Sequence, residues 1–376
     1  MSYNKKKILR AVTVPMSLCF CRDIMIKMRA MGYEMVAVTS PGPELDKLRD
    51  EDCFHCIEVK MERHISIVND TKSLWNMIKV FRKERPYLVH SMTPKAGMIC
   101  MLAAWMTRVP RRVHTFTGLV WPTATGLKRR ILMMTDWLTC ACATHIIPEG
   151  KGVMDDLRKG GITHKPMKVL GYGNVMGVDL ECFNPVRFTA RKDAETFTFM
   201  FVGRIVRDKG INELVDAFAR LHNKYKNARL VLVGKYEQEL DPVSNVTRKM
   251  IDTNSAINAC GPKYGDDLLQ MYVDADCFVM PSYREGFPNT VLEAGAMELP
   301  SVVTDINGSR EIIENGKNGL IVPPKDVDAL YKAMECMLTD KAAREMMRNN
   351  ARPMIASRFE RNFVQKCQID FYKEIM

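Results

Sequence analysis

The sequence predicts an α/β protein with two doubly wound, Rossmann-like domains. Short apolar runs alternate with helical stretches from end to end, which is typical of parallel sheets covered by helices. The series stops at a Pro- and Gly-containing passage, 171–185, and begins again near residue 195. A chain of 376 residues is also long enough for two hydrophobic cores. We therefore expect an N-terminal domain at 1–190, a C-terminal domain at 191–357 and a final helix at 358–376.

The apolar runs also place the individual elements. In the first half, strands are expected at 8–14, 35–39, 86–90 and 112–115, and helices at 22–31, 69–84, 95–106 and 127–142. In the second half, strands are expected at 197–202, 230–233, 277–280, 301–304 and 320–322, and helices at 210–225 and 291–298. Ligands of such sheets bind at the carboxyl ends of the strands, so we expect the site in a cleft between the two domains.

Composition and charge narrow the class of protein. With 47% hydrophobic, 8% aromatic and 26% charged residues, the chain is typical of globular proteins. The net charge of +11 is one-sided, because residues 1–190 hold 29 Lys and Arg against 17 Asp and Glu. A basic half favours an anionic partner, such as a membrane leaflet, a lipid phosphate or a nucleic acid. A solvated face is the alternative explanation.

Neither a metal centre nor a membrane span is expected. The twelve cysteines are scattered, and the CxxC at 53–56 has no second pair at zinc-site spacing. The longest apolar segment, 131–147, is interrupted by Asp136 and His145. No signal peptide is recognisable, so we expect a cytoplasmic protein with reduced thiols. The absence of GxGxxG before a helix, and of GxxxxGK[ST], argues against NAD enzymes and P-loop NTPases.

Two cations follow the first strand of the second domain. In FVGRIVRDKG, residues 201–210, Gly203 allows a tight turn, and Arg204 and Lys209 are expected to project from one loop. A guanidinium that forks onto phosphate oxygens, beside a lysine point charge, suits a diphosphate. Ordinary surface cations in a loop are the alternative.

A second motif, REGFPNTVLEA, carries two glutamates eight residues apart, Glu285 and Glu293. Backbone N–H groups at 289–291 are expected at a helix N-terminus, where they bind an anion, and the Asn289 and Thr290 side chains add polar partners. We expect Glu293 in the first turn of the helix, where it accepts hydrogen bonds from ribose hydroxyls. Helix capping is the alternative, since acidic residues favour first turns.

Taken together, residues 201–324 resemble the C-terminal half of the family-4 glycosyltransferases of the GT-B fold. The resemblance rests on the turn with Gly203, Arg204, Lys209 and Gly210, on LVG at 232–234, on ADCFVMPS at 275–282, on EGFPNTVLEA, on DING at 305–308 and on NGLIVP at 318–323. The segments HSMTPKA, RVHTFTG and GNVMGVDL, at 90–96, 112–118 and 173–180, resemble the bacterial subgroup that extends polyprenyl-diphosphate-linked sugars for capsule, O-antigen or glycoprotein glycans.

The resemblance implies a role for each motif residue. Arg204 and Lys209 neutralise the donor diphosphate, which becomes the leaving group. Glu293 holds the ribose and Glu285 the hydroxyls of the donor sugar. Asn289 and Thr290 cradle the distal phosphate.

On the acceptor side the resemblance implies fewer contacts. His114, expected at a strand end, matches the histidine beside the transferred sugar, and Lys95 is expected to meet the phosphates of the acceptor. The loop at 15–20 lacks the glycines that many members carry there. The helix at 126–142 combines three cations with bulky apolar residues and is expected to meet the inner membrane leaflet. A helix with a basic end that packs on the N-terminal domain is the alternative. In this fold the last helix, 358–376, crosses back to the first domain.

The implied activity is a metal-independent, retaining transfer of a hexose or N-acetylhexosamine from a UDP-sugar to a lipid-linked saccharide. No cofactor is implied, and the DxD-like triplets at 50–52, 274–276 and 326–328 are interpreted as solvated faces. The enzyme is expected to be peripheral on the inner face of the cytoplasmic membrane. A nucleotide-sugar epimerase or hydrolase of the same fold is the alternative. A nucleic-acid-binding protein is disfavoured, because the basic half lacks interleaved aromatic residues.

Overall fold

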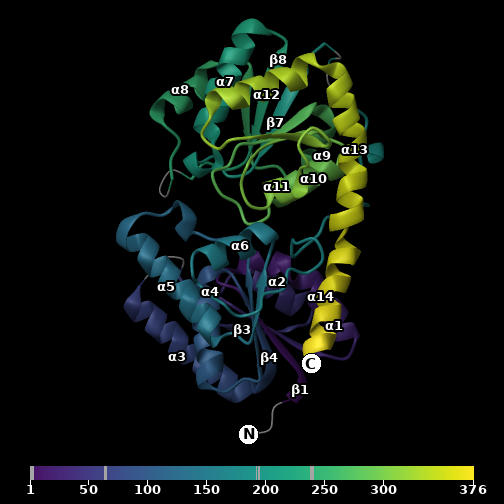
Figure 1. Ribbon diagram of the computed structural model, residues 1–376. Coiled ribbons are helices and arrows are strands. Elements are labelled where there is room, and N and C mark those ends of the chain that lie inside the picture. Colours follow the sequence, from purple (N-terminus) through teal and green to yellow (C-terminus); the bar gives the residue numbers. More distant parts are fainter. Residues whose placement is uncertain (1–3, 63–65, 192, 194, 238–240) are drawn as a thin grey trace. The chain divides into compact units, whose positions relative to one another are not determined.

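The computed structural model describes residues 4–62, 66–191, 193, 195–237 and 241–376. The chain divides into two compact units (Figure 1). Unit 1 comprises Met1–Met176 together with Asn362–Met376, and unit 2 comprises Gly177–Arg361. The second unit therefore begins at residue 177, earlier than the boundary after residue 190 that the sequence suggested, and the chain returns to unit 1 for its last helix.

In its described part, unit 1 is a six-stranded parallel sheet with the order β3-β2-β1-β4-β5-β6. Its strands are β1 (Asn4–Ala11), β2 (Glu34–Thr39), β3 (His55–Glu58), β4 (Pro86–Met92), β5 (Arg111–Phe116) and β6 (His145–Pro148). Its helices are α1 (Arg22–Ala30), α2 (Pro43–Asp50), α3 (Ile67–Glu84), α4 (Pro94–Met106), α5 (Gly126–Cys142), α6 (Lys151–Lys159) and α14 (Arg361–Ile375).

The sheet of unit 1 is buried on both faces. Neighbouring residues Ile8 and Leu9 of β1 are both fully buried, yet they belong to different apolar clusters, because successive side chains of a strand point to opposite faces. Leu9 joins the cluster under α3, α4, α5 and α6. Ile8 joins the cluster under α1, α2 and α14, where Phe371 and Tyr372 are buried. The C-terminal helix is therefore part of the core of unit 1.

Unit 2 repeats the same architecture, with the described strands in the order β12-β11-β10-β7-β8-β9, all parallel. The strands are β7 (Phe197–Val202), β8 (Ala228–Val233), β9 (Ile257–Gly261), β10 (Cys277–Met280), β11 (Ser301–Thr304) and β12 (Gly319–Val322). The helices are α7 (Ile211–Lys224), α8 (Asn245–Thr253), α9 (Gly265–Asp274), α10 (Asn289–Ala296), α11 (Ser309–Ile312), α12 (Val327–Thr339) and α13 (Lys341–Phe359). The prediction of two doubly wound parallel sheets is confirmed.

The predicted final helix at 358–376 is present as α14, but it begins three residues later than expected. Helix α13 ends at Phe359 and α14 begins at Arg361, so the chain breaks at Glu360. Val178 explains the break, because its N–H donates to Phe359 O at 2.8 Å and its carbonyl accepts from Arg361 N at 3.0 Å. No helix in the described part of the chain is long and apolar enough to cross a membrane.

Candidate active site

The motif residues of unit 2 gather at the topological switch point of its sheet. Strands β7 and β10 are neighbours, but the chain leaves β7 towards β8 on one side and leaves β10 towards β11 on the other. In open α/β sheets, ligands bind outside the carboxyl ends of the strands at this point. The loop after β7 carries Arg204 and Lys209, and the loop after β10 carries Glu285 and leads into α10.

Glycines allow these loops to touch through their backbones. Gly210 has φ +70°, and a Cβ there would lie 2.0 Å from the carbonyl oxygen of Pro281. Gly234, which follows β8, has φ +151°, and its Cβ would lie 1.8 Å from Gly203 O. No side chain fits at either position, so the motif glycines are required by close approach between the loops.

Hydrogen bonds also connect the loop after β10 to the turn at Arg207–Lys209. Tyr283 N donates to Asp208 O at 2.8 Å, and Arg284 Nε donates to Asp208 Oδ2 at 3.1 Å. Tyr283 OH donates to Glu213 Oε1, on α7, at 2.6 Å. These bonds bring Lys209 and Glu285 together, and Lys209 Nζ donates to Glu285 Oε1. Both side chains are mostly buried, with 17% and 14% of their surface exposed.

Arg204 is placed differently from Lys209. Its side chain is 51% exposed, and its Nη1 donates to Glu237 Oε2 at 2.6 Å. Each of the two cations therefore has a carboxylate partner close by, and a bound diphosphate would compete with that partner. The Arg204 guanidinium is exposed enough to turn towards a ligand.

Glu293 lies in the second turn of α10, not in the first turn as expected, because the helix begins at Asn289. It accepts a hydrogen bond from the hydroxyl of Tyr272, on α9, at 3.1 Å. Burial raises the pKa of the Glu293 carboxyl to about 7, although the bond from Tyr272 opposes the rise. The Glu293 carboxyl is therefore expected to change its charge near neutral pH.

The start of α10 offers fewer donors than expected. Asn289 and Thr290 are partly buried in its first turn. Val291 N–H already donates to Pro288 O at 3.1 Å, so it does not point at an anion as predicted. The anion site suggested by the sequence is reduced to the first two residues of the helix.

His114 is buried inside unit 1. It lies two residues before the end of β5, not at the strand end, and only 1% of it is exposed. Ser91 Oγ and His114 Nδ1 are 2.8 Å apart, and a Cβ at Gly97 of α4 would come within 2.4 Å of the ring. Burial lowers the pKa of His114 to about 3. The ring therefore offers no surface to a sugar, and its contacts are those of a neutral residue packed beneath α4.

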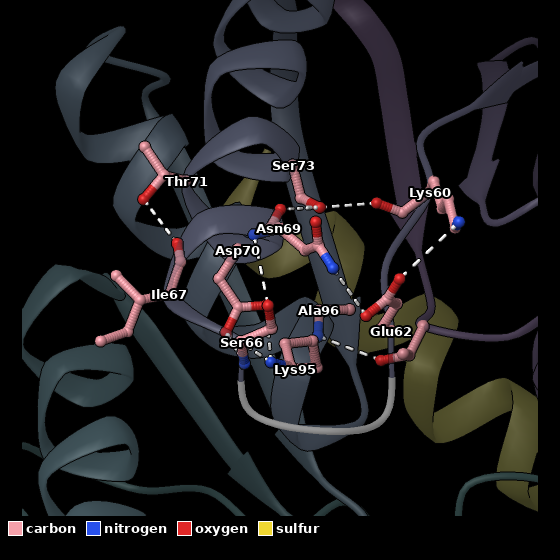
Figure 2. A network of polar contacts seen from close by, with 11 residues as sticks. Lys60, Glu62, Ser66, Ile67, Asn69, Asp70, Thr71, Ser73, Lys95 and Ala96 are labelled. Carbon is pink, nitrogen blue, oxygen red and sulfur yellow. Dashed lines mark hydrogen bonds and ion pairs between the residues drawn. The ribbon is translucent and has the colours of Figure 1, made fainter.

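Lys95 lies in the first turn of α4, at the switch point of unit 1 between β1 and β4. Its Nζ donates to both carboxylate oxygens of Asp70, on α3, at 2.6 Å each. Figure 2 shows this pair among the polar side chains at the start of α3. The two side chains are 10% and 14% exposed, so Lys95 is mostly buried and ion-paired.

Sequence reasoning missed the partners of these residues. Three predicted site residues, Lys95, Arg204 and Glu293, are contacted by Asp70, Glu237 and Tyr272 respectively. Asp208 and Glu213 hold the adjacent Tyr283 and Arg284. Of these five partners only Asp208 lies within a quoted motif, the turn at 201–210. For four of them the only signal in the sequence was a position near the end of a strand or the start of a helix, and Tyr272, near the end of α9, lacks even that signal. A pattern of that kind is too common to single them out.

The fold matches solved glycosyltransferase structures over nearly the whole chain. A glycosyltransferase from Rickettsia africae matches with a TM-score of 0.79 at 19% identity, covering 99% of both chains. Anabaena HepE in complex with UDP-glucose matches with a TM-score of 0.79 at 17% identity, covering 98% of this chain and 99% of the other. The fold is therefore GT-B.

Sequence comparison assigns the family. Residues 20–173 match the glycosyl transferase 4-like domain, and residues 184–354 match the glycosyl transferases group 1. The capsular polysaccharide biosynthesis glycosyltransferase CapM of Staphylococcus aureus is 32% identical over 367 residues, covering 96% of this chain and 95% of that protein. An Escherichia coli UDP-Gal:α-D-GlcNAc-diphosphoundecaprenol α-1,3-galactosyltransferase is 28% identical, covering 83% of this chain and 81% of that protein. The chain belongs to the group 1, family-4-like glycosyltransferases.

Proposed function

We propose that this glycosyltransferase is retaining and metal-independent, and that it moves a hexose or N-acetylhexosamine from a UDP-sugar to a polyprenyl-diphosphate-linked saccharide. The product would be a surface polysaccharide or another lipid-linked glycan. The observation that carries the proposal is the meeting of Lys209 and Glu285 at the switch point of unit 2, with Arg204 and Glu293 on the flanking elements. The names of the CapM and galactosyltransferase relatives support the class of acceptor and donor.

The chemistry follows from the charges. The bond between the anomeric carbon and the diphosphate oxygen breaks, and a bond from that carbon to an acceptor hydroxyl oxygen forms on the same face. The hydroxyl proton leaves with the nucleoside diphosphate. Arg204 and Lys209 stabilise the negative charge that grows on the leaving diphosphate, which is the step where fixed cations accelerate a reaction most. Once Lys209 turns to the phosphate, Glu285 is free to accept hydrogen bonds from hydroxyls of the sugar.

The remaining site residues bind the nucleotide. Glu293 accepts hydrogen bonds from the ribose hydroxyls, which favours its ionised form, and Asn289 and Thr290 donate to the distal phosphate. His114 was expected beside the transferred sugar, but its burial leaves it a packing role in this scheme.

Unit 1 is proposed to sit on the inner face of the cytoplasmic membrane. Helix α5 begins with three exposed cations at 128–130 and exposes large apolar side chains along its length, with Leu127 72% and Trp137 54% exposed. Exposed apolar side chains beside cations are typical of surfaces that bind anionic lipid.

A donor and acceptor screen tests the proposal. Purified protein is incubated with UDP-, GDP- and ADP-sugars, with and without a polyprenyl-diphosphate-linked saccharide, and nucleotide release is followed. We expect release only with both a UDP-sugar and the acceptor, unchanged by EDTA, and a product whose anomeric configuration by NMR equals that of the donor. Donor consumption without acceptor would instead favour the epimerase or hydrolase. A product with the inverted anomeric configuration would contradict only the retaining mechanism and would leave the rest of the proposal intact.

A further inference from the structure

Unit 1 carries an apolar groove that the proposed function has not used. It has a volume of about 450 Å³ and lies between α3, α4 and α5. This volume falls in the range of small-molecule sites. The apolar wall consists mainly of Leu74, Met98, Ile99, Leu102, Ile131 and Leu132.

The groove follows one face of α4. Its floor is formed by α4 residues that recur at helical spacing: Lys95, Met98, Ile99 and Leu102. Helices α3 and α5 supply the two sides. At a rise of 1.5 Å per residue, the seven steps from Lys95 to Leu102 span roughly 10 Å. Hydrocarbon side chains therefore line the groove along two turns of helix.

One end of the groove is ionic. Lys95 and Asp70, the pair in Figure 2, line the groove at the first turns of α4 and α3. Asp70 Oδ2 also accepts from Ser66 N at 3.3 Å, which ties the carboxylate to the start of its own helix. Helices that connect parallel strands start at the carboxyl edge of the sheet, so this end of the groove lies where ligands of such sheets bind.

The cations at this edge extend beyond Lys95. Helix α5 follows β5 in the sheet and starts at the same edge, with Lys128, Arg129 and Arg130 exposed in its first turns. A cationic edge that continues into an apolar channel is complementary to an amphiphile with an anionic head and a hydrocarbon tail.

We propose that this groove binds the isoprenoid chain of the lipid-linked acceptor, at the units nearest its diphosphate. This inference rests on the proposed function for the identity of the acceptor. Lys95 exchanges its contact with Asp70 for one with an acceptor phosphate, and the chain lies over α4 between α3 and α5. A polypeptide occupant fits less well, because the apolar walls offer few partners for its backbone N–H and C=O groups.

Photocrosslinking tests the site without relying on turnover. The probe is a farnesyl diphosphate analogue with a diazirine in its first isoprene unit, irradiated with the full-length protein and mapped by mass spectrometry. We expect labelling at α3, α4 and α5 residues of the groove, competed by unlabelled farnesyl diphosphate. Equal competition by phosphatidylglycerol vesicles would assign the groove to bilayer lipid. Labelling that vanishes on dilution to monomer would point to a second copy, and labelling elsewhere would overturn the inference.

Kinetics supply the second test. Met134→Gln changes a groove residue that is 60% exposed, and Met98→Gln changes the floor. Met106→Gln is the matched control, because Met106 is 50% exposed at the end of α4 but does not line the groove. We expect the groove variants to raise KM for a polyprenyl-diphosphate saccharide about tenfold, equivalent to about 1.4 kcal/mol. KM for the same saccharide on butyl diphosphate should not change.

The outcomes separate this inference from the proposed function. If wild type transfers sugar to both acceptors and the groove variants affect both equally, the groove inference fails while the function stands. If wild type uses neither acceptor but farnesyl diphosphate still labels the groove, the function fails and the lipid site remains. Thermal unfolding of Met134→Gln within a few degrees of wild type confirms that the fold is intact. If Met98→Gln fails to fold, Met134→Gln alone decides the kinetic test.

Discussion

Replacing Glu293 with Gln should stabilise unit 2 and weaken donor binding at the same time. Burial raises the pKa of Glu293 from 4.5 to about 7, so the folded protein holds this proton more tightly than the unfolded chain does. The resulting stabilisation is fully present below about pH 4.5 and is lost as the pH rises through 7. At about 1.4 kcal/mol per pKa unit, the loss reaches about 3 kcal/mol above pH 7. Gln stays neutral and still accepts the bond from Tyr272, so the variant avoids this loss.

Thermal unfolding from pH 5 to pH 8 measures the difference. For a domain of this size, about 3 kcal/mol corresponds to roughly 6–12 °C in Tm. We expect the Tm of Glu293→Gln to exceed that of wild type only slightly at pH 5 and by that full amount at pH 8. Glu181→Gln, an exposed residue of the same unit, should show no such trend. A Tm difference that stays constant across this range would refute the assignment of a buried, neutral carboxyl.

Donor binding gives the functional half of the same prediction. Hydrogen bonds to a charged group contribute about 1.5–3 kcal/mol, so loss of the carboxylate should raise the Kd for a UDP-sugar by roughly 10- to 100-fold at pH 8. Isothermal titration at pH 6 and pH 8 measures it, and wild type should bind more tightly at the higher pH. A variant that gains stability and keeps its donor affinity would show that Glu293 is only a buried acid.

Three further predictions concern the loops of unit 2 and the role of metals. Lys209→Met should lower kcat about 10²- to 10³-fold in the transfer assay, because it removes a fixed cation from the leaving diphosphate; an unchanged kcat would exclude Lys209 from catalysis. Gly210→Ala should lower the free energy of unfolding, measured in urea, by more than the roughly 1–3 kcal/mol that a left-handed alanine costs, because the new Cβ would meet Pro281 O. The control is Gly261→Ala, where φ is +72° but no atom lies within 4 Å of the new Cβ, so it measures backbone strain alone. Removal of divalent metal with EDTA should leave the transfer rate unchanged, and a rate that falls and is restored by Mg²⁺ would contradict the metal-independent mechanism.

The inner strands of both described sheets were predicted from the sequence, whereas of the edge strands only β12 was predicted, at 320–322. The bounds of β7, β10 and β11 match the predicted ranges residue for residue, because each is a short, mostly apolar run bounded by polar residues, Pro or Gly. Strands β3 and β9 lie at sheet edges and were missed. His55 and Glu58, at the two ends of β3, are exposed, so no apolar run marks the strand. Strand β6 was missed because it follows α5 within one apolar segment, 131–147.

The candidate site was predictable where a motif lies within one loop. The motifs predicted to share a site follow the neighbouring strands β7 and β10, because loops after adjacent parallel strands meet at one edge of the sheet. They contribute Arg204, Lys209, Glu285 and Glu293. Their roles remain predictions. The contact of Glu293 with Tyr272 depends on how α9 packs on α10, which no local pattern encodes. The burial of His114 was not predicted, because it depends on the close approach of Gly97, which lies on a different element, α4.

Both units have a lysine–carboxylate ion pair at the switch point of the sheet, and the same physical reason accounts for both pairs. Each sheet has its switch point between its first and fourth strands, and each places a lysine there against a carboxylate: Lys209 with Glu285, and Lys95 with Asp70. All four side chains are less than a fifth exposed. A lone half-buried lysine would lose hydration without compensation, and it would lie in many rotamers. The carboxylate compensates for the lost hydration and holds the lysine side chain in one place, so an arriving phosphate finds a preorganised cation and has only to replace one anion by another. On this reasoning Asp70→Asn should disorder Lys95 and so raise KM for the lipid-linked acceptor, even though the substitution removes a negative charge next to the proposed phosphate. A KM that falls instead would show that Asp70 acts only by repelling the phosphate.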